Sequence, residues 1–396
     1  MYNILLLGLV SFLTDVSTEM IYPLIPLYLV SVLGATPAAV GLIEGIAESL
    51  ASLLKVFSGA VSDRLARRKP LALLGYGLSA FAKIPIIAAV SWAWVLWGRV
   101  GDRFGKGVRT APRDALIAES AREGAMGSAF GLHRLLDTLG AVLGVTLAYY
   151  FFTRCGDYRS VFVWSLVPAF AGTAAILLVR EAKRRRPAPP PGEKPLMASW
   201  PGRVLAGWRD LDCRLKKFLA VVFLFALGNS SNQFLILRAA DLGFTAGDAV
   251  LLYLVFNIVY ALASFPAGVL SDRIGRRVLL VAGYAVYGAV YLGMAAAGPG
   301  LAVWLLFGLY GLYSGATEGV EKALVAEMAP AEKKASLLGL HATLVGIGLF
   351  PASFLAGLLW KYIGPSAPFY FGGILGILAA AALLVVLAGG RTGRCA

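Results

Sequence analysis

Carboxylate side chains occur in two pairs, each four residues apart and each inside a long apolar stretch. The first pair is Asp15 and Glu19, and the second is Glu44 and Glu48. Residues four apart lie on one face of a helix, so each pair would bring two carboxyl groups together. Two such groups in an apolar surrounding do not both ionise readily, and they can therefore take up and release a proton. We predict that these four residues couple the protein to protons.

Arg99 begins a basic segment in a later apolar stretch. It is followed by Arg103, Lys106, Arg109 and Arg113. We predict that Arg99 acts in proton coupling by holding a carboxylate of the first apolar stretch until a proton or substrate displaces it. The alternative is that the arginines and the acids form static ion pairs that hold the helices together. Positive charge in excess of the acids would suit an anionic substrate or a metal chelate, and Arg103 either lines a cavity or is paired inside the protein.

Mostly neutral hydrogen-bonding side chains take the equivalent places in the second half of the chain. An amide-rich run, G-N-S-S-N-Q at 228–233, lies in an apolar stretch that we expect to be kinked or unwound there. The facing stretch in the first half contains Pro23 and Pro26, and proline bends a helix because it lacks the N–H group. We predict that the substrate contacts Asn229, Asn232, Gln233, Tyr253, Asn257 and Glu318, together with Arg103.

Helices that cross a membrane must position these groups. Hydrophobic residues make up 59% of the chain, above the roughly 45–50% that is usual in soluble proteins. The apolar stretches are long enough to cross a hydrocarbon core of about 30 Å as helices. We expect twelve spans, at about 3–33, 38–61, 70–91, 94–117, 127–152, 159–180, 216–240, 246–270, 277–297, 300–326, 335–360 and 366–389.

Enzyme chemistry has no recognisable motif here. The sequence contains no phosphate-binding glycine loop with its Lys-Ser/Thr, no metal-ligand spacing and no nucleophile elbow. The twelve spans also leave no room for a separate soluble catalytic domain. We therefore expect neither an enzyme nor a bound cofactor or metal.

A short charged segment occurs in both halves of the chain. Residues 59–69 read G-A-V-S-D-R-L-A-R-R-K, and residues 268–277 read G-V-L-S-D-R-I-G-R-R. These segments resemble the signature loops of the major facilitator superfamily, between helices 2 and 3 and between helices 8 and 9. The resemblance implies an all-α membrane protein with twelve transmembrane helices in two pseudo-symmetric six-helix bundles. Such bundles alternately expose a central site to each side of the membrane.

The repeated segments also predict a conformational latch. Glycine permits close approach of a neighbouring helix, and an aspartate can bond a helix end across the bundle interface. A topology anchor without a latch function is the alternative. The predicted latch residues are Gly59, Asp63, Arg64, Arg67, Arg68, Gly268, Asp272, Arg273 and Arg276. A separate spacing of small residues, Gly140-x-x-x-Gly144, predicts close helix packing in the fifth span.

The distribution of charge predicts the domains and the topology. We expect bundles at 1–180 and 215–396, joined by a proline-rich, basic linker at 181–214. The formal net charge is +14, but between the spans only Arg154, Arg159 and Lys361 fall in the loops opposite the linker. This asymmetry places both termini and the linker in the cytoplasm. The basic runs then face membrane lipid rather than nucleic acid.

The function that we favour is a proton-coupled exporter, an antiporter that uses the proton gradient to move a small organic molecule. We expect a monomer in the bacterial cytoplasmic membrane. Efflux of a metal ion or of a metal–organic acid chelate is an alternative. A receptor or scaffold with a transporter fold that moves nothing is a further one, although a passive scaffold needs neither internal acids nor latch loops.

Overall fold

The computed structural model describes residues 2–65, 68–121, 126–181, 212–329 and 334–388. These residues form helices joined by turns and short loops, and none of them is in a strand. In the first half the helices are α1 (Tyr2–Ile21), α2 (Ile25–Ser31), α3 (Pro37–Leu65), α4 (Lys69–Phe81), α5 (Lys83–Ile87), α6 (Trp92–Ser120), α7 (Met126–Cys155), α8 (Tyr158–Trp164), α9 (Leu166–Ala175) and the 3-10 helix η1 (Ile176–Leu178). In the second half they are α11 (Cys213–Gly228), α12 (Gln233–Asp241), α13 (Ala246–Ile274), α14 (Arg276–Ala296), α15 (Leu301–Met328), α16 (Lys334–Tyr362) and α17 (Ala367–Ala388).

Ten helical segments in the described part of the chain are long and apolar enough to cross a membrane. They are Tyr2–Ser31, Pro37–Lys55, Lys69–Ile87, Ser128–Cys155, Tyr158–Leu178, Cys213–Asp241, Ala246–Ile274, Arg276–Ala296, Leu337–Tyr362 and Ala367–Leu387. The more polar α6 and α15 fall outside this set but have 29 and 28 residues, as many as their neighbours. A helix of that length is about 42 Å long and can cross a bilayer. The predicted all-α membrane fold is confirmed.

The two interrupted spans that the sequence predicted are present, and the spans Lys69–Ile87 and Tyr158–Leu178 are interrupted as well. Of the two predicted spans, the first is broken between α1 and α2 at Tyr22–Leu24, where Pro23 cannot donate a helical hydrogen bond. The second is broken between α11 and α12, within the amide-rich run. These two breaks face each other, because the Tyr22 hydroxyl lies 3.4 Å from Ser231 Oγ. They therefore bring polar groups of both halves to one place.

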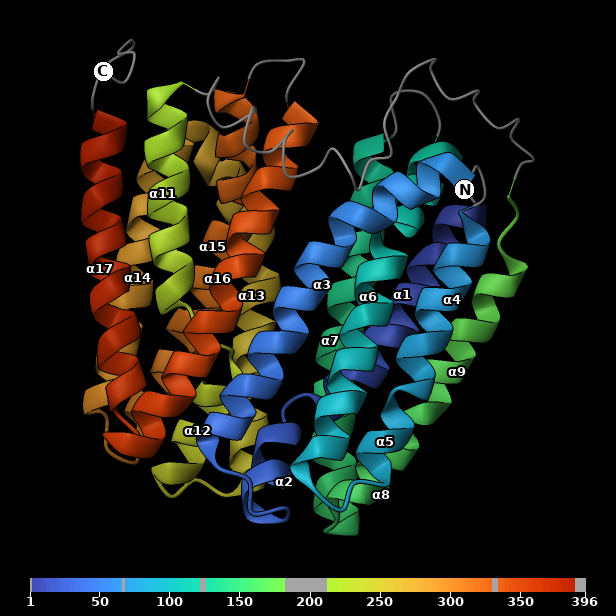
Figure 1. Cartoon of the computed structure of the whole chain (residues 1–396), viewed down its shortest axis with the longest axis horizontal. Helices are drawn as coiled ribbons and strands as arrows, with labels where there is room; N and C mark the ends of the chain where they lie inside the picture. Colours follow the sequence, from blue (N-terminus) through green and yellow to red (C-terminus); the bar gives the residue numbers. More distant parts are fainter. Residues whose placement is uncertain (1, 66–67, 122–125, 182–211, 330–333, 389–396) are drawn as a thin grey trace.

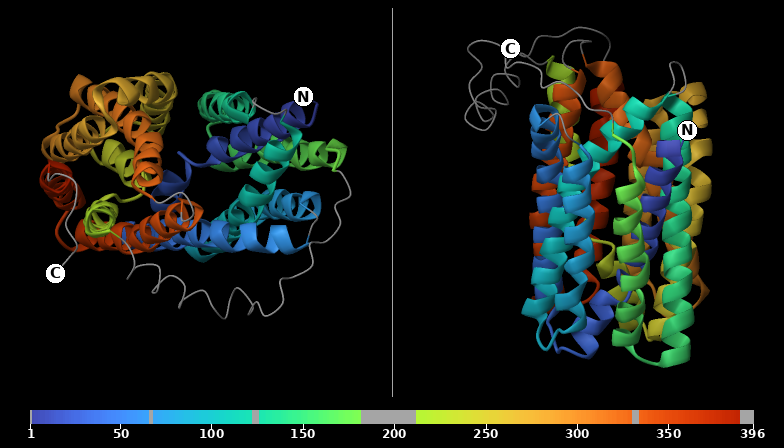
Figure 2. Two further views of the ribbon diagram at one scale, coloured as in Figure 1. Left: turned by 90° about the horizontal axis from the view of Figure 1, so that it is seen from above. Right: turned by 90° about the vertical axis from the view of Figure 1, so that its right-hand side faces the viewer.

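The helices form two bundles side by side, α1–η1 and α11–α17 (Figure 1). The view along the bundles separates the same two groups (Figure 2, left). The start of α1 and the end of α17 lie at one end of the molecule, which we call the terminus end. The bundles diverge toward the terminus end and meet at the opposite, closed end, where α2 and α12 lie (Figure 1).

The closed end is sealed by α3 of the first bundle against α16 of the second. A Cβ atom on Gly45 would lie 2.9 Å from the Phe350 carbonyl oxygen, and one on Gly357 would lie 2.6 Å from the Pro37 carbonyl oxygen. Only glycine allows such backbone contact between helices. The seam between α3 and α16 therefore holds the bundles together at this end.

Inside the first bundle, α1 and α7 also pack at backbone distance. A Cβ atom on Gly140 would lie 2.5 Å from the Phe12 carbonyl oxygen, and one on Gly144 would lie 2.5 Å from the Val16 carbonyl oxygen. The close packing predicted for Gly140-x-x-x-Gly144 is confirmed. It brings Asp15 of α1 next to Asp137 of α7.

Candidate functional site

The Arg99 guanidinium of α6 binds the Glu44 carboxylate of α3 through two hydrogen bonds. Arg99 Nε lies 2.7 Å from Glu44 Oε1, and Arg99 Nη2 lies 2.8 Å from Glu44 Oε2. Both side chains are buried, and a bidentate pair fixes the orientation of both groups. The prediction that Arg99 holds a carboxylate of the first span was wrong. The helix packed most extensively against α6 is α3, and α1 touches it much less.

A second ion pair follows one helical turn further along the same two helices. Arg103 Nη2 lies 2.9 Å from Glu48 Oε1. The two acids are four apart on α3 and the two arginines are four apart on α6, so the pairs form a ladder. For Glu44 and Glu48 the structure therefore has the ion-paired arrangement that the sequence left open.

The Glu44–Arg99 pair also contacts the second bundle. Ser231, in the break between α11 and α12, has its hydroxyl 3.5 Å from Glu44 Oε2. The Arg99 guanidinium lies 5.4 Å from the centre of the Tyr22 ring, and that ring lies 5.5 Å from the Tyr253 ring of α13. The Glu44–Arg99 ion pair therefore contacts residues at the closed end, where the two bundles meet.

The two acids of α1 contact different helices. The Tyr253 hydroxyl of α13 donates a hydrogen bond to Glu19 Oε2 at 3.2 Å. The Asp15 side chain lies next to the Asp137 side chain of α7. The structure thus places Asp15 beside Asp137, whereas Glu19 reaches the second bundle.

A third polar group connects the bundles nearer the terminus end. The Tyr260 hydroxyl of α13 donates to Glu318 Oε2 of α15 at 2.5 Å. Arg134 of α7 contacts both, with Nη2 3.5 Å from Glu318 Oε2. Lys322 Nζ lies 3.4 Å from Glu318 Oε1. Arg134 is 53% exposed and Glu318 48% exposed, because the bundles are already apart at this level.

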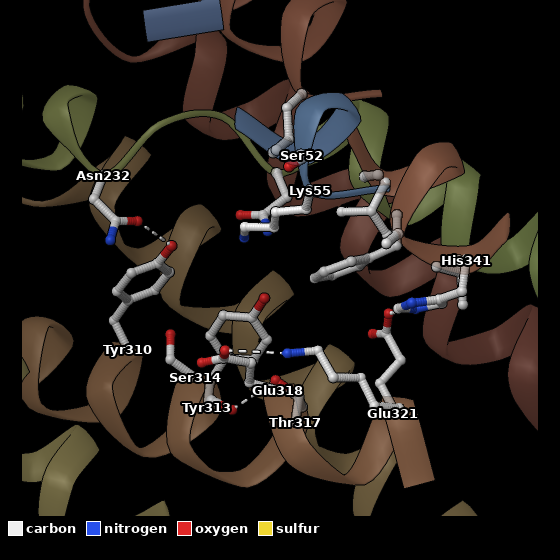
Figure 3. Close-up of a pocket in the computed structure, with 18 residues that line it drawn as sticks. Ser52, Lys55, Asn232, Tyr310, Tyr313, Ser314, Thr317, Glu318, Glu321 and His341 are labelled. Carbon is white, nitrogen blue, oxygen red and sulfur yellow. Dashed lines mark hydrogen bonds and ion pairs between the residues drawn. The ribbon is translucent and has the colours of Figure 1, made fainter. Parts of the chain in front are cut away.

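A cavity of about 350 Å³ opens beside Glu318 (Figure 3). Most of its wall comes from α11, α15 and α16 of the second bundle, and α3 of the first bundle closes one side. The lining residues are Ser52, Lys55, Val222, Phe225, Ala226, Asn229, Asn232, Tyr310, Tyr313, Ser314, Thr317, Glu318, Glu321, Lys322, His341, Ala342, Val345 and Leu349. Three aromatic residues line it together with many polar and charged groups, and its volume is in the range of sites for small organic molecules.

Three of the predicted substrate residues, Asn229, Asn232 and Glu318, line this cavity. Asn232 Oδ1 accepts a hydrogen bond from the Tyr310 hydroxyl at 2.8 Å. Gln233 does not line it. That side chain is buried, and neither of its amide atoms has a hydrogen-bond partner among the described residues.

The other three predicted substrate residues lie outside the lining of the cavity. Arg103 is paired with Glu48. Tyr253 binds Glu19, and Asn257 Nδ2 donates to the Tyr253 carbonyl oxygen at 2.9 Å. These groups are occupied by protein partners in this arrangement.

The predicted latch is described only in part. Gly59, Asp63 and Arg64 belong to α3, but their side chains lie outside the described part of the chain, as does the whole of Arg67. A Cβ atom added to Gly268 would have no described atom within 4 Å, and Arg273 is exposed.

The latch residues that are described form matching ion pairs in the two bundles. Arg68 Nη1 lies 2.5 Å from Glu119 Oε1 at the end of α6. Arg276 Nη1 lies 3.1 Å from Glu327 Oε2 at the end of α15, and its Nη2 lies 3.1 Å from Asp272 Oδ1. Each of these ion pairs stays within its own bundle in this arrangement.

Sequence reasoning assigned no role to Lys55, Lys106 or Asp137, and it favoured simple packing for Tyr310 and Tyr313. Helical spacing carried the missing signal. Lys55 continues the face of α3 that bears Glu44 and Glu48, and Lys106 continues the face of α6 that bears Arg99 and Arg103. Nothing in the sequence indicated that α7 would place Asp137 against Asp15.

The alternative of metal-ion efflux would be supported by a cluster of side chains that could hold a metal ion. Among the described residues, no group of three or more His, Cys, Asp and Glu side chains is placed to hold a metal ion. The alternative of metal-ion efflux therefore gains no support from a preformed site in this part of the chain.

Comparison with known proteins identifies one family. The family model described as Major Facilitator Superfamily matches residues 7–237 and 218–393. An uncharacterized MFS-type transporter of Methanocaldococcus jannaschii is 36% identical over 391 residues, which cover 97% of this chain and 94% of that protein. The multidrug resistance protein MdtH of Edwardsiella ictaluri is 31% identical over 177 residues, 42% of this chain and 44% of that protein.

Among solved structures, a mutant of the nucleoside transporter NupG matches with a TM-score of 0.80 and 13% identity, covering 97% of this chain and 99% of that one. A POT family transporter in complex with 5-aminolevulinic acid also matches with a TM-score of 0.80 and 13% identity, covering 97% and 96%. At such low identity the likeness concerns the fold alone.

Proposed function

Because the chain belongs to the major facilitator superfamily, we propose that it is a secondary transporter that uses protons to export a small organic molecule. The protein is an integral membrane transporter. The proton coupling, the direction and the class of cargo form the proposal. The partial likeness to MdtH, a protein named for multidrug resistance, supports export.

One contact carries the proposal of proton coupling, the hydrogen bond from Tyr253 to Glu19. An ionised carboxylate accepts a stronger hydrogen bond than a neutral carboxyl group, by roughly a factor of two. Since Glu19 belongs to the first bundle and Tyr253 to the second, protonation of Glu19 weakens a bond that holds the bundles together. Proton uptake would thereby change the free-energy difference between two arrangements of the bundles.

The charged surroundings of Glu19 support the same role. Lys106, Arg103 and Arg99 of α6 are the cations near Glu19, and Asp15 is one turn away on α1. These cations compensate the negative charge of the Glu19 carboxylate before it takes up a proton. The neighbouring carboxyl groups of Asp15 and Asp137 offer a second place where a proton can be held.

We place the terminus end in the cytoplasm, following the positive-inside distribution of charge. In that orientation the arrangement described here is closed to the outside and open to the cytoplasm. The bundles 1–180 and 215–396 would move against each other, with the linker 181–214 as their tether. We propose a monomer in the cytoplasmic membrane whose basic loops face anionic lipid.

Flux into and out of proteoliposomes under an imposed pH gradient tests this proposal. The purified chain would be assayed with a lipophilic cation, an organic acid and metal–citrate, and compared with the variants Glu19→Gln and Asp15→Asn. Asp157→Asn is the matched control, because Asp157 caps α8 in a loop and asparagine caps a helix equally well. Driven flux that is lost in Glu19→Gln and kept in Asp157→Asn supports coupling through Glu19. Flux that is independent of the pH gradient in the native chain and in every variant contradicts the proposal.

A further inference from the structure

Lys55 places an ammonium group in the cavity without an acidic partner. It lines the cavity from α3 and points into it (Figure 3). No carboxylate oxygen lies within ion-pair distance of its Nζ in the described part of the chain. Its nearest acid, Glu48, is paired with Arg103 at 2.9 Å. A charge that is partly removed from water without a counter-ion is costly, so such a group needs a ligand or a function.

Two further lysines surround Lys55. Lys106 of α6 and Lys322 of α15 are both close enough to repel its charge. Lys322 lines the same cavity and contacts Glu318, whereas Lys106, like Lys55, has no ion-pair partner among the described residues. Helices from both bundles thus direct positive charge to one place.

The acids of the cavity are already bound. Glu318 accepts a hydrogen bond from Tyr260 and contacts the cations Arg134 and Lys322. Glu321 lies 2.5 Å from His341 Nε2 and accepts a hydrogen bond from the Tyr284 hydroxyl at 2.7 Å. The charge that lacks a partner in this cavity is therefore positive.

From this juxtaposition we propose that the cavity binds an organic anion, an aromatic or other apolar molecule that carries a carboxylate or a similar acidic group. Lys55 and Lys322, which line the cavity, bind the acidic group, and Lys106 adds positive charge next to Lys55. The inference concerns the cargo of the transporter proposed above and rests on that function.

The aromatic residues of the cavity suit the apolar body of such a molecule. Phe225 stacks on Tyr284 with a ring-centre distance of 3.8 Å, and the rings of Tyr310 and Tyr313 have a centre spacing of 5.4 Å. Rings held in this way present apolar faces at little conformational cost. Asn229 and Asn232 add neutral hydrogen-bonding groups to the lining. The cavity thus combines aromatic faces from α11 and α15 with the positive charges of Lys55 and Lys322.

Three probes of one shape and different charge test the inference. They are naphthalene-carboxylate, its neutral carboxamide and naphthylmethylammonium, and their binding to the purified full chain is measured by calorimetry. We expect the carboxylate to bind about ten-fold more tightly than the carboxamide, the gain of one charge-assisted hydrogen bond. The ammonium probe should bind most weakly.

Variants of Lys55 make the assignment specific. Lys55→Gln should reduce the affinity for the carboxylate about ten-fold and leave that for the carboxamide unchanged. Lys55→Arg should retain the preference for the anion, which also shows that the fold tolerates a change at this position. Lys361→Gln, at the closed end, is the control, because Lys361 is exposed beside Tyr362 and far from the cavity.

The inference is overturned if the carboxylate fails to bind, if the ammonium probe binds as tightly, or if Lys55→Gln leaves the preference for the anion intact. Its failure is distinguishable from failure of the proposed function. If a proton gradient drives a lipophilic cation equally well in Lys55→Gln, proton-coupled transport is supported and an organic anion as the cargo is contradicted. If the carboxylate binds as expected but no flux is driven by the gradient, binding of the anion is supported and proton-coupled transport is contradicted.

Discussion

Arg99 and Glu44 form a bidentate ion pair between α6 and α3, buried beside the place where the two bundles meet. Ser231 of the second bundle reaches the same carboxylate. The pair therefore belongs both to the internal structure of the first bundle and to the closed end. A buried pair of this kind is costly to break, because the remaining partner is left as an unpaired charge.

Removal of both partners should destabilise the protein by less than the two single removals added together. Glu44→Gln removes the bidentate partner of Arg99 and leaves its guanidinium only the longer contact of 3.8 Å between Arg99 Nη1 and Asp102 Oδ2. We expect a loss of about 3–5 kcal/mol in the free energy of unfolding. The double variant Glu44→Gln with Arg99→Gln should lose less than the sum of the two single losses. Denaturant titration of the purified protein in detergent measures the free energy of unfolding of the two single variants and of the double variant. Additive losses would show that the two side chains are not coupled.

The seam between α3 and α16 should respond to a single methyl group. Gly45→Ala would place its Cβ 2.9 Å from the Phe350 carbonyl oxygen, so the closed end should separate more often. Genetically encoded spin labels at Thr36 and Lys361, on opposite bundles at the closed end, would report the separation as a longer distance. Gly308→Ala is the control, since no atom lies within 4 Å of that added Cβ. Equal distances in the two variants would contradict a sealing role for the seam.

Tyr253→Phe should uncouple transport from protons without removing a carboxyl group. The change deletes the donor to Glu19, a hydrogen bond to a charged group that is worth about 1.5–3 kcal/mol. We expect flux driven by a pH gradient to fall about ten-fold or more, while exchange of substrate at equal pH continues. Tyr370→Phe is the matched control, because Tyr370 is exposed on α17. A driven flux as high in Tyr253→Phe as in Tyr370→Phe would argue against this route.

The sequence predicted the spans, the helix breaks at Pro23 and in the amide-rich run, and the close packing around Gly140 and Gly144, because each depends on local composition. The apolar length of a span, the missing N–H of Pro23 and the spacing of small residues act within one segment. Partners of the buried charges depend instead on which helices become neighbours. For that reason the pairing of Arg99 with Glu44 contradicted the prediction.

The cavity illustrates the same limit. The spacing along α3 places Lys55 on the face that carries Glu48, and this much could be deduced from the sequence. That Lys322 of the other bundle lines the same cavity follows only from the way in which the two bundles come together. Whether a lysine in the cavity has an acidic partner depends on how the two bundles are assembled, so the sequence of a single helix does not reveal it.

The measurement that tests the central claim most directly is the distance between spin labels at Thr36 and Lys361 as a function of pH, in lipid and without substrate. The account holds that protonation of Glu19 weakens a bond between the bundles. The closed-end distance should therefore lengthen as the pH falls from about 8 to about 4.5, a range that includes the ordinary titration of a glutamate. Glu19→Gln, which carries no charge, should show the longer distance at both extremes. A distance that is independent of pH in the native chain, or that changes with pH equally in Glu19→Gln, would contradict the account.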